Sequence, residues 1–224
     1  MTFNEFAFYL GIFSAVLLAL GVVVGLVVYN KLNALHKSIF VYLVLMLGID
    51  WTSRAFTLII GTNLVIIPIF SFVELLFFIC FYNKYLLDKP NKVLIGSGCI
   101  GLIYIVAEFL QYFVFNTLNL KQFQPYCKIA DNFVIIIMAL VFYYQKMNNF
   151  NETKWTNFKL NTAILFYFTI NAIIYIPFNF IINETIGVRL YIWIVNVVVV
   201  ILFYSYLTFL VWKSGRRAIA KSSS

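Results

Sequence analysis

Charged residues are scarce in this sequence: only 11% of its 224 residues are Asp, Glu, Lys or Arg, whereas 63% are hydrophobic. A soluble domain typically carries about 25% charged residues. The composition therefore excludes an ordinary water-soluble domain and indicates a protein built for lipid. The net charge of +8 does not indicate nucleic-acid binding, because the basic residues gather in the short polar segments between apolar runs.

Histidine and cysteine are also rare. The single histidine, His36, and the three cysteines, Cys80, Cys99 and Cys127, show neither a metal-ligand spacing nor a disulfide framework. We therefore expect no cofactor and no metal. No Lys or Arg precedes the first apolar run, which is also too long for a signal peptide, so the run is typical of a first membrane helix.

Long apolar runs, in contrast, are abundant. A helix that crosses a bilayer needs about 20 predominantly apolar residues, and the sequence contains seven such runs. They predict an all-α, polytopic membrane protein that forms a seven-transmembrane-helix bundle. The predicted spans are 5–29, 38–60, 64–87, 93–115, 126–146, 158–183 and 187–212. The transmembrane domain would thus cover 1–213, followed by a short basic cytoplasmic tail at 214–224.

The basic residues between the spans predict the orientation, because cytoplasmic loops are enriched in Lys and Arg. Twelve basic residues lie on one side of the predicted spans. Only Lys121, Lys128 and Arg189 lie on the other side. The sequence therefore predicts an N-terminus outside the cell and a cytoplasmic C-terminus.

Four acidic residues lie inside the apolar runs: Asp50, Glu74, Glu108 and Asp131. Arg54 follows Asp50 by one helical turn. An ionised side chain at the bilayer centre costs about 2.5–3.5 kcal/mol on the insertion scale, and such residues commonly mark a functional site. They predict a polar site within the membrane-spanning part of the protein.

The helical rise of about 1.5 Å per residue places these groups in the outer half of the bundle. Together with two asparagines at similar depth they form the predicted ligand-binding set: Asp50, Arg54, Glu74, Glu108, Asp131, Asn179 and Asn196. Polar side chains between membrane helices also serve simply to hold helices together. That structural role stays open for Asn196 and for the Asp50–Arg54 pair.

Charge counting sharpens the prediction. Arg54 and Lys128 are the two cations of this layer and face four carboxylates, which leaves a formal excess of two negative charges. Buried carboxylates in that situation hold a proton or recruit a cation. We expect that Glu74 or Glu108 is protonated at neutral pH, or is neutralised by a bound cation or cationic ligand.

Seven spans invite comparison with known seven-helix proteins. The last span contains no lysine for a retinal Schiff base, and the receptor motifs Asp-Arg-Tyr and Asn-Pro-x-x-Tyr are absent from spans three and seven. The segments LGIDWTSRAF, FSFVELLFFICFYNKYL and IWIVNVVVVILFYSYL resemble small, largely uncharacterised seven-helix membrane proteins of Bacteroidota. Such proteins look like stand-alone sensory modules, sometimes accompanied by histidine kinases. The resemblance implies a receptor role in a bacterial cytoplasmic membrane, carried by Asp50, Arg54 and Glu74.

The leading hypothesis is a receptor-like sensor that binds a small molecule or cation in an outward-facing acidic pocket. The chain carries no kinase, cyclase or phosphatase, so it would signal to a separate protein, such as a histidine kinase. One alternative is a proton- or cation-coupled transporter or channel component. A second is a structural subunit of a membrane complex. A third is an intramembrane enzyme acting on lipid, although no catalytic residue can be assigned.

Overall fold

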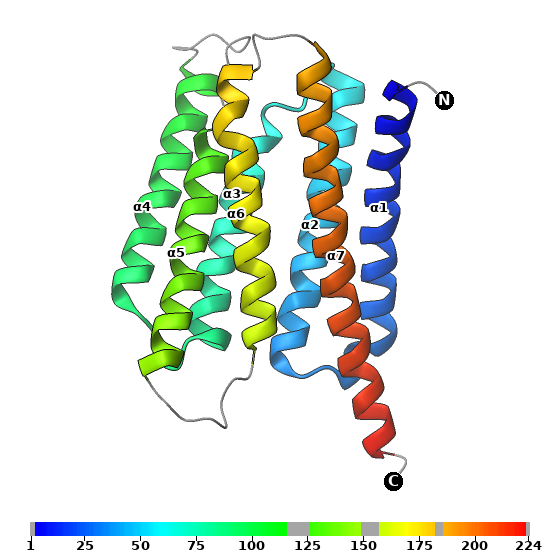
Figure 1. Cartoon of the computed structure of the whole chain (residues 1–224), viewed down its shortest axis with the longest axis vertical. Helices are drawn as coiled ribbons and strands as arrows, with labels where there is room; N and C mark the ends of the chain where they lie inside the picture. Colours follow the sequence, from blue (N-terminus) through cyan, green and yellow to red (C-terminus); the bar gives the residue numbers. More distant parts are fainter. Residues whose placement is uncertain (1–2, 116–125, 149–156, 182–185, 223–224) are drawn as a thin grey trace. The chain divides into compact units, whose positions relative to one another are not determined.

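The computed structural model describes residues 3–115, 126–148, 157–181 and 186–222, without the side chains of 3–4, 178–189 and 219–222. Over these ranges the chain is all-α (Figure 1). The seven α-helices are α1 (Phe3–Val28), α2 (Ala34–Ile60), α3 (Ile66–Phe81), α4 (Lys92–Phe109), α5 (Tyr126–Asn148), α6 (Phe158–Ile181) and α7 (Ile186–Ser222). Within the described residues, seven helices are long and apolar enough to cross a membrane, as the hydropathy pattern predicts.

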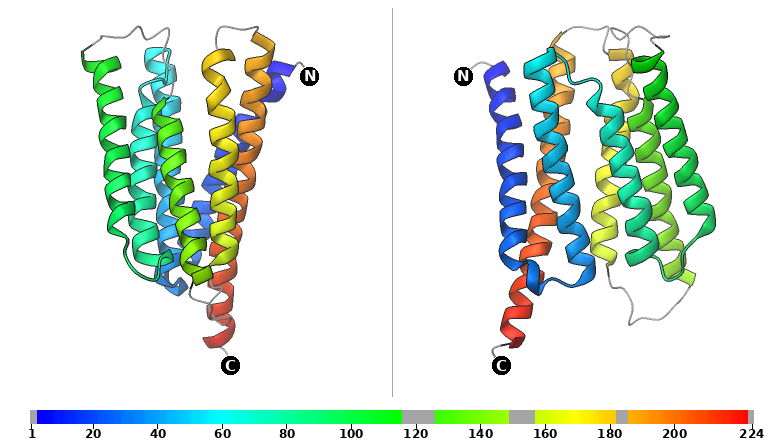
Figure 2. Two further views of the ribbon diagram at one scale, coloured as in Figure 1. Left: turned by 60° about the vertical axis from the view of Figure 1, so that its left-hand side comes forward. Right: turned by 180° about the vertical axis from the view of Figure 1, so that it is seen from behind.

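The last helix is longer than the sequence predicts. α7 spans 37 residues and runs to Ser222 instead of ending at 212. At about 1.5 Å per residue its length is roughly 55 Å, well beyond the hydrocarbon thickness of about 30 Å. The backbone of the predicted basic tail is therefore helical as far as Ser222, and α7 continues past the end of α1 (Figure 2).

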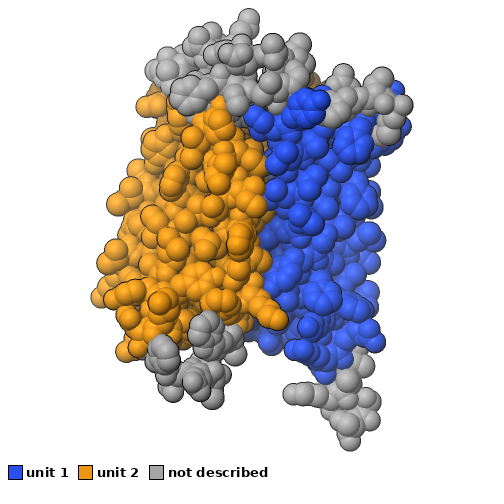
Figure 3. Space-filling model, viewed as in Figure 1, with its two compact units in different colours: residues 1–55, 186–224 blue, residues 56–185 orange. Residues whose placement is uncertain are grey.

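The chain divides into two compact units, which we describe one at a time (Figure 3). The first unit comprises residues 1–55 and 186–224. In it α1 and α7 pack side by side along their length, with Gly11 against Trp193 and Val28 against Gly215. A Cβ atom on Gly215 would lie 2.5 Å from the Val28 Cβ, so glycine permits this close approach.

The second unit comprises residues 56–185. Here α3, α4 and α5 pack against one another, and α6 packs against α5. The phenol of the buried Tyr82, which follows α3, donates a 2.7 Å hydrogen bond to the Asn161 Oδ1 of α6. The Asn161 amide in turn donates to the Ala139 carbonyl of α5, at 3.1 Å. These two bonds join three helices at one end of the unit.

The same end carries the turn between α3 and α4. Asn91 caps α4, because its side-chain oxygen accepts from the Val93 amide at 2.9 Å and from the next amide at 3.4 Å. The carboxylate of Asp88 pairs with Lys146 near the end of α5, at 2.6 Å. The turn is thus attached to the helix that carries most of the polar site described next.

Candidate functional site

A buried lysine pairs with two carboxylates in the second unit. Lys128 belongs to the first turn of α5, and its ammonium lies 3.0 Å from the Asp131 Oδ2. It also pairs with the carboxylate of Glu74 on α3. Lys128 is only 2% exposed, and both carboxylates are fully buried. The spacing of Lys128 and Asp131 places them on one face of α5, and the packing of α3 against α5 brings Glu74 to the same ammonium.

Aromatic rings cover this ammonium. The Lys128 Nζ lies 4.3 Å from the ring centroid of Phe70 on α3 and 5.8 Å from that of Phe168 on α6. A cation over a ring face is attracted by the ring quadrupole, more strongly where water is excluded. Side chains from α3, α5 and α6 therefore hold the charge of Lys128 away from solvent.

Several buried polar atoms next to this ion cluster have no hydrogen-bond partner among the described residues. They are the Ser71 Oγ, the Asp131 Oδ1, both amide atoms of Asn132 and both carboxylate oxygens of Glu108. Buried polar groups in proteins are almost always hydrogen-bonded, and each exception calls for an explanation such as a bound ion or water. These atoms lie on α3, α4 and α5.

Glu108 reaches this region from α4 and is 5% exposed. Its polar neighbours are the Tyr104 hydroxyl on its own helix and, at the start of α5, the Cys127 thiol and the backbone amides of Tyr126 and Cys127. The Cys127 thiol also faces Ser71, and Ser71 faces Asp131. We call the six residues that converge here the core cluster: Ser71, Glu74, Glu108, Cys127, Lys128 and Asp131.

The structure thus brings three predicted site residues, Glu74, Glu108 and Asp131, into one region of the second unit. Lys128, which the sequence analysis counted both among the outer basic residues and as a cation of the polar layer, lies in the first turn of α5. There it is buried as the counter-ion of two carboxylates. The sequence-based binding set omitted Lys128, Ser71 and Cys127. The three-residue spacing of Ser71–Glu74 and of Lys128–Asp131 was the signal that would have added Ser71 and Lys128 to the set.

Asp50 and Arg54 belong to the first unit and pair along their own helix. The Arg54 Nε donates to the Asp50 Oδ2 at 2.7 Å, and an Arg54 terminal nitrogen donates to the other carboxylate oxygen at 3.3 Å. That nitrogen also donates to the Gly11 carbonyl of α1, at 3.0 Å. The Arg54 and Asp50 side chains are 44% and 30% exposed. The pair therefore links α2 to α1, and its role in ligand binding stays a prediction.

Neither of the two predicted asparagines, Asn179 and Asn196, is placed in the core cluster by the described side chains. Asn196 is half-buried on α7 in the first unit, and it has interaction partners there. The side chain of Asn179, near the end of α6, lies outside the described residues. The ligand roles of both stay predictions.

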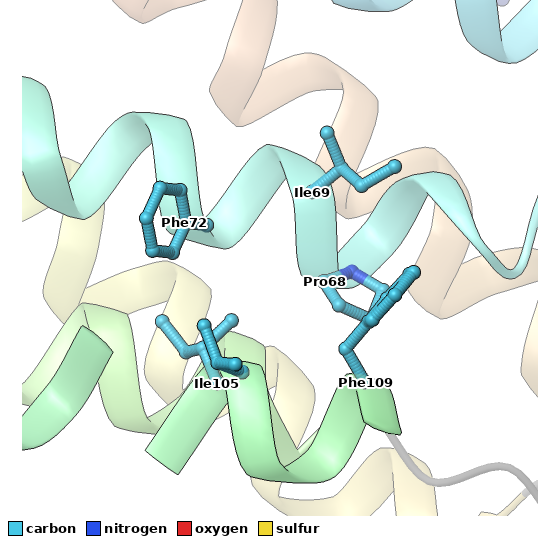
Figure 4. Close-up of a pocket in the computed structure, with 6 residues that line it drawn as sticks. Pro68, Ile69, Phe72, Ile105 and Phe109 are labelled. Carbon is cyan, nitrogen blue, oxygen red and sulfur yellow. The ribbon is translucent and has the colours of Figure 1, made fainter. Parts of the chain in front are cut away.

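An apolar groove lies between α3 and α4 in the second unit. Figure 4 shows Pro68 and Phe72 of α3 facing Ile105 and Phe109 of α4. The groove has a volume of about 190 Å³ and is lined by these residues with Ile69 and Val106. None of the predicted ligand-binding residues lines it, so it is not the acidic pocket that the sequence predicts. Among the residues described, no group of three or more His, Cys, Asp or Glu side chains is arranged to hold a metal ion.

Comparison with known proteins found no matching family model, no matching curated protein and no matching solved structure. The function must therefore be inferred from the residues of this chain alone.

Proposed function

We propose that this protein is a receptor-like sensor of a bacterial cytoplasmic membrane. In this proposal a small molecule or cation binds the core cluster and changes the packing of the second unit. A separate signalling protein reads that change. The observation that carries the proposal is the buried charge imbalance: among the described residues of this region three carboxylates, Glu74, Glu108 and Asp131, are buried with one cation, Lys128, which pairs with Glu74 and Asp131.

The imbalance defines the chemistry of the ligand. Three carboxylates and one ammonium give a formal charge of −2 when all are ionised. Taking charges out of water costs several kcal/mol for each ion, and an unpaired buried charge is strongly destabilising. A ligand that brings positive charge to the core cluster lowers this cost, so a cation or a small cationic molecule is favoured over an anion.

A change in charge at the core cluster can also alter how α3 and α5 pack toward the end of the unit that carries Lys84. Neutralising Asp131 would leave the Lys128 ammonium to Glu74 alone and strengthen the attraction between α5 and α3. Glu74 lies ten residues before Lys84 in the chain, roughly 15 Å along the helix. A ligand shifts a conformational equilibrium only if it binds the two states with different affinity. A change in the ion pairing between α3 and α5 supplies such a difference.

The distribution of basic residues supports the proposed orientation. With Lys128 assigned to α5, twelve Lys and Arg residues between and after the spans lie on the proposed cytoplasmic side, against Lys121 and Arg189 outside. The signalling partner would then meet a basic surface that includes Lys84 and Lys92, both exposed.

A reporter in the turn that follows α3 tests the proposal. Lys84→Cys, labelled with an environment-sensitive fluorophore after Cys80→Ala and Cys99→Ala remove the two exposed thiols, is reconstituted in lipid nanodiscs. Sodium, potassium, protons and small alkylammonium ions are the probes. We expect at least one to shift the emission of the labelled protein and to lose its effect in Glu108→Gln/Asp131→Asn.

Glu5→Gln is the matched control for this experiment, because Glu5 is an exposed acid on α1 of the other unit. This control variant should respond like the parent. A reporter that is silent to every probe, or that responds equally in the core-cluster double variant, would overturn the proposal.

The charge excess also favours a second function, a proton- or cation-coupled transporter, because intramembrane carboxylates line many ion pathways. Proteoliposomes separate the two. A sensor shifts the reporter without net flux, whereas a transporter produces sodium or proton uptake that Glu108→Gln abolishes.

A further inference from the structure

Two of the three buried carboxylates are connected by side chains that each can donate and accept a hydrogen bond. Glu108 on α4 neighbours the Cys127 thiol, and this thiol faces the Ser71 hydroxyl. Ser71 in turn faces Asp131. All four residues are at most 5% exposed. The result is a buried line of neighbouring polar groups from α4 through α5 and α3 back to α5, in which no hydrogen bond joins one member to the next.

The groups facing this line define its electrostatics. From α4 the Tyr104 hydroxyl faces Glu108, and from α5 the Lys128 ammonium contacts Asp131. From α3 Glu74 faces Asp131 across Lys128, and from α6 the Tyr175 hydroxyl faces Lys128. Lys128 is therefore the only cation facing the line among the described residues, and Glu74 and Asp131 share it.

The buried charge points to one added proton, because three buried carboxylates lie with one buried ammonium among the described residues. The Asp131 Oδ1, the Ser71 Oγ and both Glu108 oxygens have no partner within hydrogen-bonding distance in the described part of the chain, although the Tyr104 hydroxyl, the Cys127 thiol and the backbone amides of Tyr126 and Cys127 face Glu108. Ionised carboxylates are acceptors only, whereas a protonated one gains an O–H donor. One added proton changes the formal charge of the core cluster from −2 to −1 and lets one of the two carboxyl groups donate a hydrogen bond.

We infer that the core cluster holds one proton, shared between Glu108 and Asp131 through the Ser71 hydroxyl and the Cys127 thiol. The proton comes from water and forms an O–H bond to a carboxylate oxygen, and its release restores the carboxylate. Glu74 is not assigned the proton, because neither of its oxygens is among the unpartnered buried atoms, whereas Asp131, which Lys128 contacts through Oδ2, keeps an unpartnered Oδ1. The inference rests on the proposed function and deepens it, since it names a proton as the cation that the sensor binds.

Infrared spectroscopy of the full-length protein in nanodiscs tests this directly. The carbonyl stretch of a protonated carboxylic acid is separate from the bands of ionised carboxylates. We expect one such band at pH 7 in the wild type and its loss in Glu108→Gln/Asp131→Asn. The matched control Asp88→Asn removes an acid that pairs with Lys146 at the edge of the unit, and it should retain the band.

A second variant keeps the test decisive if the double variant does not fold. Ser71→Ala/Cys127→Ala changes no charge, and it removes both groups between the carboxylates. We expect the acid band to shift in frequency, because the proton loses its hydrogen-bonding neighbours. An absent band at pH 7 in the wild type, or a band that neither variant changes, would overturn the inference.

The two proposals fail separately. If the acid band is absent while the Lys84→Cys reporter responds to another cation, the proton assignment is wrong and the sensor proposal stands. If the band behaves as expected while the reporter is silent to pH and to every other probe, the sensor proposal is wrong and the proton assignment stands.

Discussion

Replacement of Lys128 by methionine should destabilise the protein far more than the loss of either carboxylate partner. Methionine keeps most of the side-chain volume but removes the charge. Glu74 and Asp131, both fully buried, would then be left without their cation. Loss of one partner from a buried ion pair costs about 3–5 kcal/mol, because the remaining charge stays uncompensated.

The other single variants have smaller expected effects. In Glu74→Gln the ammonium still lies 3.0 Å from Asp131, so one intact pair remains and the unfolding free energy should fall by less than in Lys128→Met. The triple variant Lys128→Met/Glu74→Gln/Asp131→Asn removes all three charges. The triple variant should recover much of the lost unfolding free energy, because replacing a buried ion pair by uncharged, well-packed side chains often changes stability little.

Reversible unfolding in mixed micelles, followed by circular dichroism as the SDS fraction rises, measures these free energies. Lys146→Met is the matched control, because it breaks a pair in which Lys146 is 13% and Asp88 39% exposed. The control should lose about 0–1 kcal/mol. A loss in Lys128→Met no larger than in this control, or a triple variant less stable than Lys128→Met, would refute the reasoning.

Three further variants test the packing around the site by the same unfolding assay. Tyr82→Phe leaves the buried Asn161 oxygen without its 2.7 Å donor and should lower the unfolding free energy by about 1–3 kcal/mol. An unchanged unfolding midpoint would argue against this hydrogen bond. Asn91→Ala removes the α4 cap and should cost about 1 kcal/mol, whereas a stabilising effect would contradict the cap. Gly215→Val places a side chain against Val28 and should cost about 1–3 kcal/mol; full stability would show that α1 and α7 are not in close contact there.

The seven helices were predictable because a chain that crosses hydrocarbon must satisfy its backbone hydrogen bonds internally. Each span therefore appears as an uninterrupted apolar run. The end of α7 was not predictable in this way, since hydropathy marks where apolar residues stop and not where helical hydrogen bonding stops. The residues from Lys213 onward are polar enough to read as a tail, yet the helix continues to Ser222.

The candidate site was predictable in part. Glu74, Glu108 and Asp131, which the sequence predicts to lie within the membrane-spanning part, are buried, and the four-residue spacing of Asp50 and Arg54 produces the expected pair. The partner of Glu74 was not predictable. It depends on the axial offset between α3 and α5, which side-chain packing sets and which neither helix encodes alone.

The central claim is that polar side chains of α3, α4 and α5 converge in the core of the second unit. Disulfide crosslinking tests it most directly, because Cys127 is a native buried thiol that faces Ser71. With Cys80 and Cys99 replaced by alanine, Ser71→Cys should crosslink to Cys127 on mild oxidation and lose both free thiols. Leu76→Cys, on an exposed position of α3, should keep them. Equal reactivity of the two variants, or no crosslink in Ser71→Cys, would contradict the account.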